Sequence, residues 1–331
     1  MKIAVLPIGM LLALVACGGG SSAPTSPAPA PQPAPAPAPG ILSGILVDTV
    51  SGAPVAGASL AFAGGPVLTT SSDGRWEFAP AGTTALRDVV VTAAGLVTRQ
   101  TAVRWEAAGR ADVRLDAIAD RAPFRLDFYR QFARDTRDQP DSPRALRRWT
   151  QAPNFSIDVT NPKDGERLTA SEIDSVERVL RAAVPQLTGG AFQAGIIETG
   201  LGPVKAQTGY ISVTFVSEPG ADFCGWAYVG ANPGEIVINY DRCYSGCGRF
   251  APETLAHEVG HALGFFHTSS PGIMHPDRSR RCDNLEFSQE ERVHAAIVYA
   301  RPNGNRDTDE DPAGYAAVET AAPPVVVSCK G

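Results

Sequence analysis

The chain has 331 residues, of which 44% are hydrophobic and 19% charged, and it carries a formal net charge of −6 at pH 7. The hydrophobic content is ample for globular folding, and the length exceeds what one hydrophobic core usually organises, so we expect two domains. Because the net charge is negative, the sequence gives no sign of a basic surface for nucleic acid, and no nucleic-acid partner is expected.

The segment 1–17 has the order of an export signal. Lys2 precedes an apolar run from Ile3 to Val15, which is too short to remain in a bilayer as a spanning helix. The run ends in Leu14-Val15-Ala16-Cys17, which resembles a bacterial lipobox. The resemblance implies cleavage before Cys17 and acylation of that cysteine, and so an exported cell-envelope lipoprotein, anchored by lipid at the outer membrane or cell surface. The alternative is an ordinary secretory signal with an incidental cysteine.

Residues 18–40 begin with glycine and serine and continue in alternating proline and alanine. This composition has little apolar surface to bury and favours an extended polyproline II backbone. We interpret the segment as a tether that holds the folded part of the chain away from a membrane.

Residues 41–118 carry short β-rich runs separated by turn signals such as Asp73-Gly74. The runs are Ile45–Val47, Ser59–Ala63, Arg75–Phe78, Val89–Ala93 and Ala111–Leu115. Their length and spacing predict a small all-β sandwich. The string SGILVDTVSGAPVAGASLAF, followed by TTSSDGRWEFAPAG, resembles the carboxypeptidase regulatory-like, transthyretin-like sandwich domains of exported bacterial proteins. A rigid spacer and a binding module for sugar, peptide or envelope component remain alternatives.

Residues 119–300 have the mixed pattern of an α+β domain. An entering helix is indicated by Phe124, Phe128 and Phe132. Strands are predicted at Phe155–Val159, Ile211–Val216 and Ile236–Asn239. Two further helices are marked by capping boxes, Thr169 with Glu172 and Ser288 with Glu291. Residues 301–331 are expected to form an acidic, flexible tail.

A histidine-rich helix is predicted at residues 252–263, with Pro252 in its first turn. His257 and His261 then project from one face and can share one zinc ion. Gly264 can adopt a left-handed conformation and end the helix, so that the chain turns back and His267 supplies a third nitrogen.

Three neutral ligands leave tetrahedral zinc with an open fourth position, as in a catalytic site. Glu258 points in a neighbouring direction, where it can reach water on the metal but not the metal itself. We predict that zinc lowers the pKa of this water towards ~7 and that Glu258, as general base, takes its proton while the water attacks a carbonyl.

The spacing His257-Glu258-x-x-His261-x-x-Gly264-x-x-His267, with Met274 in SSPGIMHP, resembles the metzincin zinc peptidases and their Met-turn. The string HEVGHALG, and Thr268 after the third histidine, are most similar to matrixin-like members. The string CGWAYVGANPGEIVINYD looks like the edge strand that lines their substrate cleft. The resemblance covers most of 124–305 and implies a metzincin fold with one catalytic zinc and a protein or peptide substrate. We expect that substrate to lie extended beside Ile236–Asn239.

Two features depart from the metzincin pattern. Pro276 stands two residues after Met274, where many metzincins place a tyrosine, and too few histidines remain for a second, structural zinc. Met274 itself is expected to form an apolar floor beneath the zinc. We interpret His275 as a hydrogen-bonding or rim residue and His294 as structural or exposed.

Five cysteines remain after Cys17, and in an exported protein they favour disulfides. Four of these cysteines lie close together in the sequence, namely Cys224, Cys243, Cys247 and Cys282, and they allow three disulfide pairings. Cys329 is then left without a partner in this scheme. A structural zinc on Cys243 and Cys247 is the alternative.

The acidic tail alternates residues that could hold calcium, namely Asn303, Asn305, Asp307, Asp309 and Asp311. The segment lacks the glycine and the distal glutamate of an EF-hand loop. A solvated acidic loop is the alternative to a Ca²⁺ site.

Together these features predict a zinc-dependent endopeptidase anchored at the bacterial cell envelope. The alternative is a surface binding or adhesion lipoprotein, in which the sandwich is the active part and the zinc site is structural or vestigial. Neither the cleaved sequence nor an oligomeric state follows from the sequence.

Overall fold

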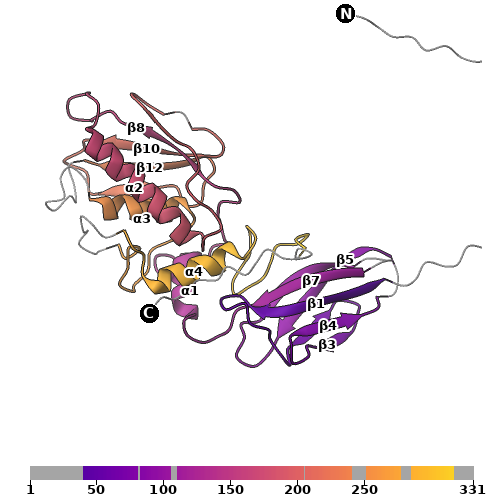
Figure 1. The fold of residues 1–331 in the computed structure, drawn as a ribbon. Helices are drawn as coiled ribbons and strands as arrows, with labels where there is room; N and C mark the ends of the chain where they lie inside the picture. Colours follow the sequence, from indigo (N-terminus) through magenta and orange to yellow (C-terminus); the bar gives the residue numbers. More distant parts are fainter. Residues whose placement is uncertain are drawn as a thin grey trace, which may run out of the picture. The chain divides into compact units, whose positions relative to one another are not determined.

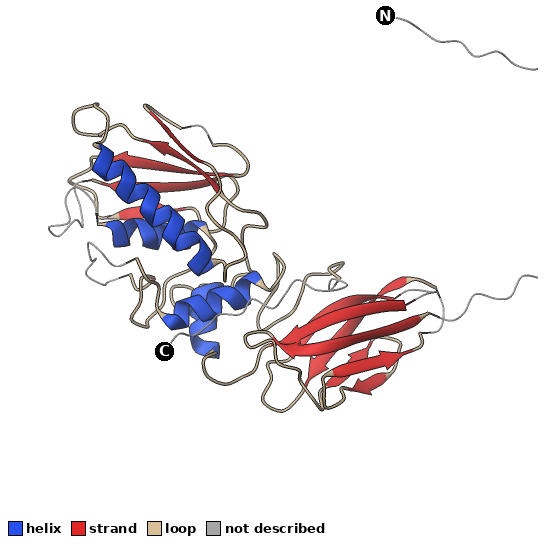
Figure 2. Cartoon of the chain, in the orientation of Figure 1, coloured by secondary structure: helices blue, strands red, loops and turns tan. Residues whose placement is uncertain are grey.

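The computed structural model describes residues 40–80, 83–105, 110–204, 206–240, 251–276 and 285–316. The export signal, Cys17 and residues 18–39 of the tether therefore lie outside the described residues. In Figures 1 and 2, a part made of strands precedes a part that mixes strands and helices. None of the described helices is both long and apolar enough to cross a membrane.

Seven strands form the first part (Figure 1): β1 (Ile41–Asp48), β2 (Ser59–Phe62), β3 (Val67–Thr69), β4 (Arg75–Phe78), β5 (Ala85–Thr92), β6 (Arg99–Trp105) and β7 (Arg110–Ala117). They make a three-stranded sheet in the order β4-β1-β7 and a four-stranded sheet in the order β3-β2-β5-β6. In β7 the side chains of Ala111, Val113, Leu115 and Ala117 are buried. These side chains share one core with residues of both sheets, so this part is a two-sheet sandwich.

All five predicted strands of this part are present, and the structure adds β3 and β6. Strand β6, with the sequence RQTAVRW, was not predicted, because its first residue, Arg99, is charged and is nevertheless buried. Hydropathy cannot mark such a position, since the burial depends on a carboxylate partner elsewhere in the chain.

A five-stranded sheet organises the second part: β8 (Asn154–Asp158), β9 (Ile197–Gly200), β10 (Tyr210–Val216), β11 (Gly225–Ala227) and β12 (Gly234–Asn239). The order is β11-β12-β10-β8-β9. Neighbouring strands are parallel except β11, which runs antiparallel to β12 and lies at the edge of the sheet.

Four helices accompany this sheet (Figure 2): α1 (Leu126–Arg134), α2 (Ala170–Leu187), α3 (Pro252–Ala262) and α4 (Gln289–Tyr299). Both predicted capping boxes are confirmed, at the starts of α2 and α4. Helix α3 packs against α2, β11 and β12, with Leu255 and Val259 in the main core. The described chain is thus a multidomain α+β protein, in which α3 lies beside the antiparallel edge of the sheet.

Residues 301–311, which follow α4, take part in a network of buried charges. The guanidinium of Arg301 is fully buried, and its Nε and Nη2 donate to the two carboxylate oxygens of Asp309 at 2.6 and 2.8 Å. Arg301 also pairs with Asp116 of β7, and Arg99 of β6 pairs with Asp116 and, at 2.9 Å, with Asp311. Burial alone would raise the pKa of Asp116, but Arg301 and Arg99 hold that pKa well below its usual range.

Asn305 extends this network to the chain after α1. Its Nδ2 donates to Asp309 at 3.0 Å and to Asp311 at 2.8 Å, while the buried Arg134 of α1 donates to its carbonyl and its Oδ1. The amide of Leu146 donates to the same carbonyl at 2.9 Å. Asn305, Asp309 and Asp311 of the acidic segment are therefore buried and bonded within a network that contains three arginines. No ligand group that could hold calcium occurs there among the described residues, and residues 317–331 lie outside them.

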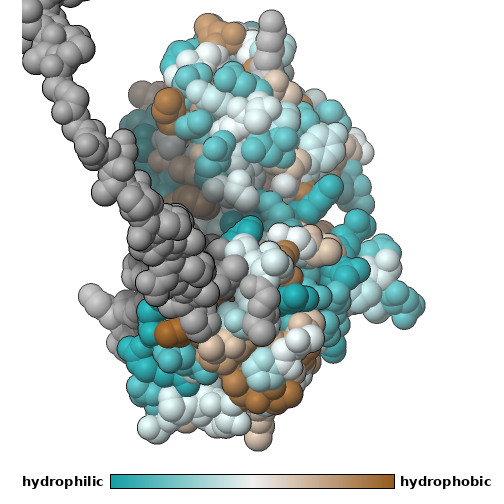
Figure 3. All heavy atoms as spheres, turned by 90° about the vertical axis from the view of Figure 1, so that its right-hand side faces the viewer, coloured by the Kyte–Doolittle hydropathy of each residue, from teal (hydrophilic) through white to brown (hydrophobic). Residues whose placement is uncertain are grey.

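On the face drawn in Figure 3, apolar side chains of the described residues occur in small groups among polar ones. Tyr228, Leu201 and Ile196 are among the large apolar residues that are more than half exposed. Scattered exposure of this kind is ordinary for a folded surface.

Candidate metal centre

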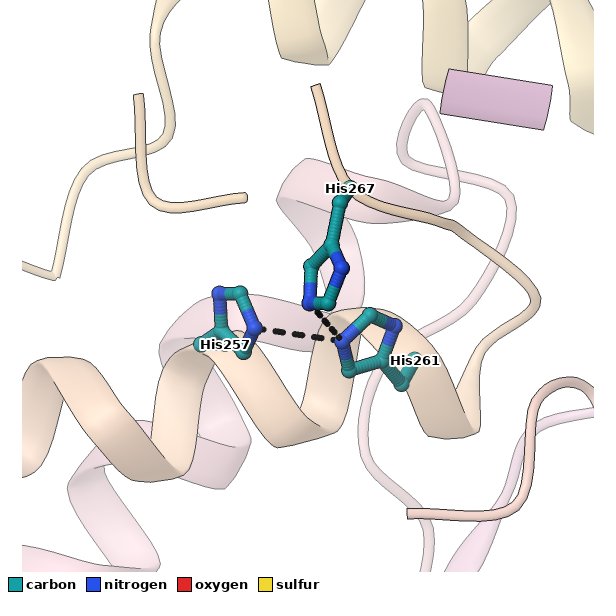
Figure 4. Close-up of side chains that lie close together, drawn as sticks. All are labelled: His257, His261 and His267. Atoms are coloured by element: carbon teal, nitrogen blue, oxygen red, sulfur yellow. Dashed lines mark hydrogen bonds between the residues drawn. The ribbon is translucent and has the colours of Figure 1, made fainter. Parts of the chain in front are cut away.

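Three histidines converge on one point beside α3 (Figure 4). The Nε2 atom of His261 lies 3.1 Å from Nε2 of His257 and 3.2 Å from Nε2 of His267. All three ligand atoms lie within 4.8 Å of one another. Within the part of the chain that the structure describes, no other group of three or more side chains is arranged to hold a metal ion.

Local sequence explains how α3 presents this group. Pro252 occupies the first turn, and His257 and His261 follow one turn apart on the same face. Gly264 has a φ of +113°, which L side chains rarely adopt, and a Cβ there would lie 1.9 Å from the carbonyl oxygen of Arg147. Both the backbone conformation and the closeness of the segment at Arg147 therefore require a glycine at position 264. The turn at Gly264 brings His267 back towards His257 and His261.

The histidines are oriented so that they can bind a cation. The Nδ1 atom of each ring donates a hydrogen bond; for His257, His261 and His267 the acceptors are the carbonyl of Ile273 (2.7 Å), the carbonyl of Phe265 (2.7 Å) and Oδ2 of Asp138 (2.9 Å). Each Nε2 therefore directs a lone pair at the centre, and lone pairs this close repel unless a cation lies between them. Zn–N bonds of ~2.0–2.1 Å at tetrahedral angles place ligand nitrogens about 3.3 Å apart. The two separations from Nε2 of His261, 3.1 and 3.2 Å, fit zinc.

The predicted Met-turn lies directly against α3. Met274 is fully buried, and a Cβ at Gly260 would lie only 2.3 Å from its Sδ. The carboxylate of Glu291 accepts from the amide of Met274 at 2.7 Å and from the amide of Ser288 at 2.6 Å. The capping box of α4 thus also holds the turn that carries Met274, and burial raises the pKa of Glu291.

Glu258 lies in the wall of a cavity of about 470 Å³ that the three histidines also line. Strand β11 also lines this cavity, and Gly225 lies so close to Glu258 that a Cβ on Gly225 would be 2.9 Å from Cγ of Glu258. A second cavity of about 1380 Å³ shares Ala227, Val229, His261 and His267 with the first. The two cavities therefore adjoin and form one groove along β11 and the loop that follows it.

The expected pairing of a substrate with Ile236–Asn239 is wrong, because both edges of β12 are occupied. It bonds to β10 on one side and to β11 on the other. Strand β11, within the string that resembles the edge strand of metzincins, forms the edge of the sheet beside α3, and no strand of the described residues pairs with its outer side. A three-residue strand that contains glycine is too short to be recognised from periodicity.

The two remaining histidines lie outside the metal-binding group, as predicted. His275 is partly exposed and follows Met274, while Pro276 lines the smaller cavity. His294 of α4 is buried; its Nδ1 donates to the carbonyl of Glu290 at 2.7 Å, and its Nε2 accepts from the amide of Arg125 at 3.0 Å. Burial lowers the pKa of His294 to about 4, so the ring is neutral and structural at pH 7.

The cysteine pairing stays a prediction. Cys224, beside β11, is within the described residues, but Cys243, Cys247, Cys282 and Cys329 lie outside them. The alternative zinc site on Cys243 and Cys247 falls in the same undescribed stretch.

Sequence reasoning missed the groups that support the metal ligands. Asp138 belongs to a polar run, RDTRDQPDSP, with no spacing relation to the motif. Ile273 and Phe265 act through backbone carbonyls, which carry no sequence signal. Glu291 was identifiable as part of a capping box, but its bond to Met274 was not.

Comparisons with known proteins agree with this geometry. The family model of the astacin peptidases matches residues 203–280, which include the three histidines and Met274. No curated protein matches the chain.

Solved structures resemble the chain only distantly. A type II cohesin–X-dockerin complex from Acetivibrio cellulolyticus is 17% identical with a TM-score of 0.20 and covers 24% of this chain and 57% of its own. The Bacillus anthracis TIE protein is 12% identical with a TM-score of 0.22 and covers 40% and 23%. The GM1-bound form of the ECX AB5 holotoxin is 14% identical with a TM-score of 0.31 and covers 48% and 84%. The chain thus spans less than two thirds of the length of the first two, and such scores carry no argument about fold or function.

The family match and the three-histidine group, taken together, support a zinc-dependent metallopeptidase of the metzincin class.

Proposed function

We propose that this chain is a matrixin-like zinc endopeptidase of the bacterial cell envelope, with Glu258 as its general base. One observation carries the proposal: three Nε2 atoms converge beside Glu258 in a groove that continues past them on both sides. A groove of this form accepts the middle of a peptide, which favours cleavage of internal bonds.

The free edge of β11 is suited to hold an extended peptide. The carbonyl of Cys224 accepts from Asn239 at 2.8 Å, and the amide of Tyr228 donates to Glu235 at 3.1 Å. Since bonding residues alternate along an antiparallel strand, Gly225 and Ala227 direct their N–H and C=O groups to the open edge. A substrate that pairs with them would pass directly in front of the three histidines.

We propose that Glu258 moves a proton at this point. Zinc, when held by the three histidines, supplies a Lewis acid that activates water and polarises a peptide carbonyl. The carboxylate of Glu258 takes the proton from the attacking water and delivers it to the departing amine. Its burial beside Gly225 holds it in the wall of the cavity that the three histidines line.

Metal removal tests this function directly. The chain from residue 18 onward is expected to contain one zinc by elemental analysis and to cleave unfolded casein. Because the open metal site is essential to the chemistry, dialysis against a strong zinc chelator should stop cleavage, and added zinc should restore it. A protein that binds zinc stoichiometrically yet cuts no unfolded protein would favour the binding-lipoprotein alternative.

The envelope location rests on the lipobox and the tether. Replacing Cys17 by Ser removes the thiol that acylation needs. We therefore expect the variant to lose incorporation of labelled fatty acid and to leave the membrane fraction, while its casein cleavage is unchanged. Equal labelling of parent and variant would refute the lipid anchor. The two-sheet sandwich of residues 41–117 is proposed to be a carboxypeptidase regulatory-like, transthyretin-like spacer between this anchor and the peptidase.

A further inference from the structure

The third histidine differs from the other two in how its ring is held. His257 and His261 donate to backbone carbonyls that lie within 16 residues of them. His267 donates instead to the carboxylate of Asp138, a residue 129 positions earlier in the chain. The side chain of His267 is also 30% exposed, so fewer packing contacts fix its orientation.

The contact lies on the far side of the ring from the metal centre. Oδ2 of Asp138 is 2.9 Å from Nδ1 of His267, whereas Nε2 of the same ring faces the other two histidines. Asp138 therefore supports the ligand and does not compete for the metal. From this geometry we propose that Asp138 is the positioning residue for the third zinc ligand.

A carboxylate does more for a metal-binding histidine than a carbonyl does. It holds the proton on Nδ1, fixes the plane of the ring and raises the basicity of Nε2. Its negative charge also offsets part of the charge of a divalent cation bound beyond the ring. The second carboxylate oxygen of Asp138 accepts from Nη1 of Arg137 at 2.6 Å, which restrains the carboxylate.

The segment that carries Asp138 is docked on the loop that carries His267. The amide of Phe266 donates to the carbonyl of Phe132 at 2.8 Å, and the amide of Ser269 donates to the side chain of Gln131 at 2.7 Å. Both acceptors belong to the last turns of α1. The end of α1 and the residues after it thus act as an external support for the third ligand, which the motif itself does not contain.

The test compares Asp138→Ala and Asp138→Asn with Asp141→Asn, a change at an exposed residue of the same segment that makes no described side-chain contact. Zinc affinity is measured by competition with a chromogenic chelator, and the free energy of unfolding of the metal-free proteins by urea. We expect zinc binding to weaken about 10–100-fold in Asp138→Ala, since loss of such a partner typically has this effect. Asp138→Asn, which keeps an acceptor but loses the charge, should lie between Asp138→Ala and the parent.

The inference rests on the proposed zinc site but not on peptidase activity. A parent protein that binds no zinc would overturn the proposed function. A parent that binds zinc while Asp138→Ala binds it equally well would overturn only the role of Asp138. An unchanged urea midpoint of the metal-free variants distinguishes positioning from a general structural defect. A loss of affinity that merely follows a large loss of stability would refute positioning.

Discussion

Glu258→Gln is expected to reduce cleavage of casein by about 10²–10⁴-fold, because the amide cannot take a proton from the attacking water. The variant keeps the size of the side chain, so its fit against Gly225 in the cavity wall is preserved. The zinc content should stay equal to that of the parent, since Glu258 is not part of the three-nitrogen group. Initial cleavage rates and elemental analysis of the same samples measure both quantities.

Glu166→Gln is the matched control. It makes the same chemical change on an exposed turn, away from the residues that line either cavity. Its cleavage rate and zinc content should both equal those of the parent. If Glu258→Gln cleaved as fast as this control, Glu258 could not be the general base.

Arg301→Met is expected to lower the free energy of unfolding by about 3–5 kcal/mol, because it leaves buried carboxylates without their partner. The guanidinium holds both oxygens of Asp309 and also pairs with Asp116 of the sandwich. Arg99 compensates part of the charge of Asp116, whereas Asp309 keeps, among its described side-chain contacts, the hydrogen bond from Asn305. Urea denaturation of the whole chain, followed by tryptophan fluorescence, gives the comparison.

Arg306→Met offers a control in the same segment. The side chain of Arg306 is 62% exposed and pairs with Glu310, four residues later. Exposed pairs of this kind contribute at most about 1 kcal/mol. A loss for Arg301→Met no larger than that for Arg306→Met would show that the buried network does not stabilise the fold.

The contacts of Arg301 also show that the two expected domains share buried ion pairs. Asp116 and Arg99 belong to β7 and β6 of the sandwich, whereas Arg301 and Asp309 follow α4. Removing the sandwich would therefore expose Arg301 to solvent or leave it without its partner Asp116. Experiments on the peptidase are best done with residues 41–316 kept together.

Much of the metal centre was predictable because it depends on neighbours in the chain. The ligand spacing is set by helical geometry, since His257 and His261 are one turn apart. The capping boxes of α2 and α4 are formed by residues three positions apart. The strands of the sandwich were visible where buried and exposed side chains alternate, as in β7.

What the sequence by itself determined is therefore the helical histidine motif, the capped helices and most strands, because local spacing and the alternation of apolar residues mark each of them. Met274 was identified through the metzincin resemblance. Only the tertiary structure decided that Asp138 supports His267, that Glu291 holds the turn of Met274, and that β11 is the edge strand beside α3. It also decided that Asp309 and Asp311 are buried against arginines instead of solvated. The physical reason is that these partners meet through packing between distant segments, and a charge or a short strand does not reveal in the sequence which distant group will neutralise or pair with it.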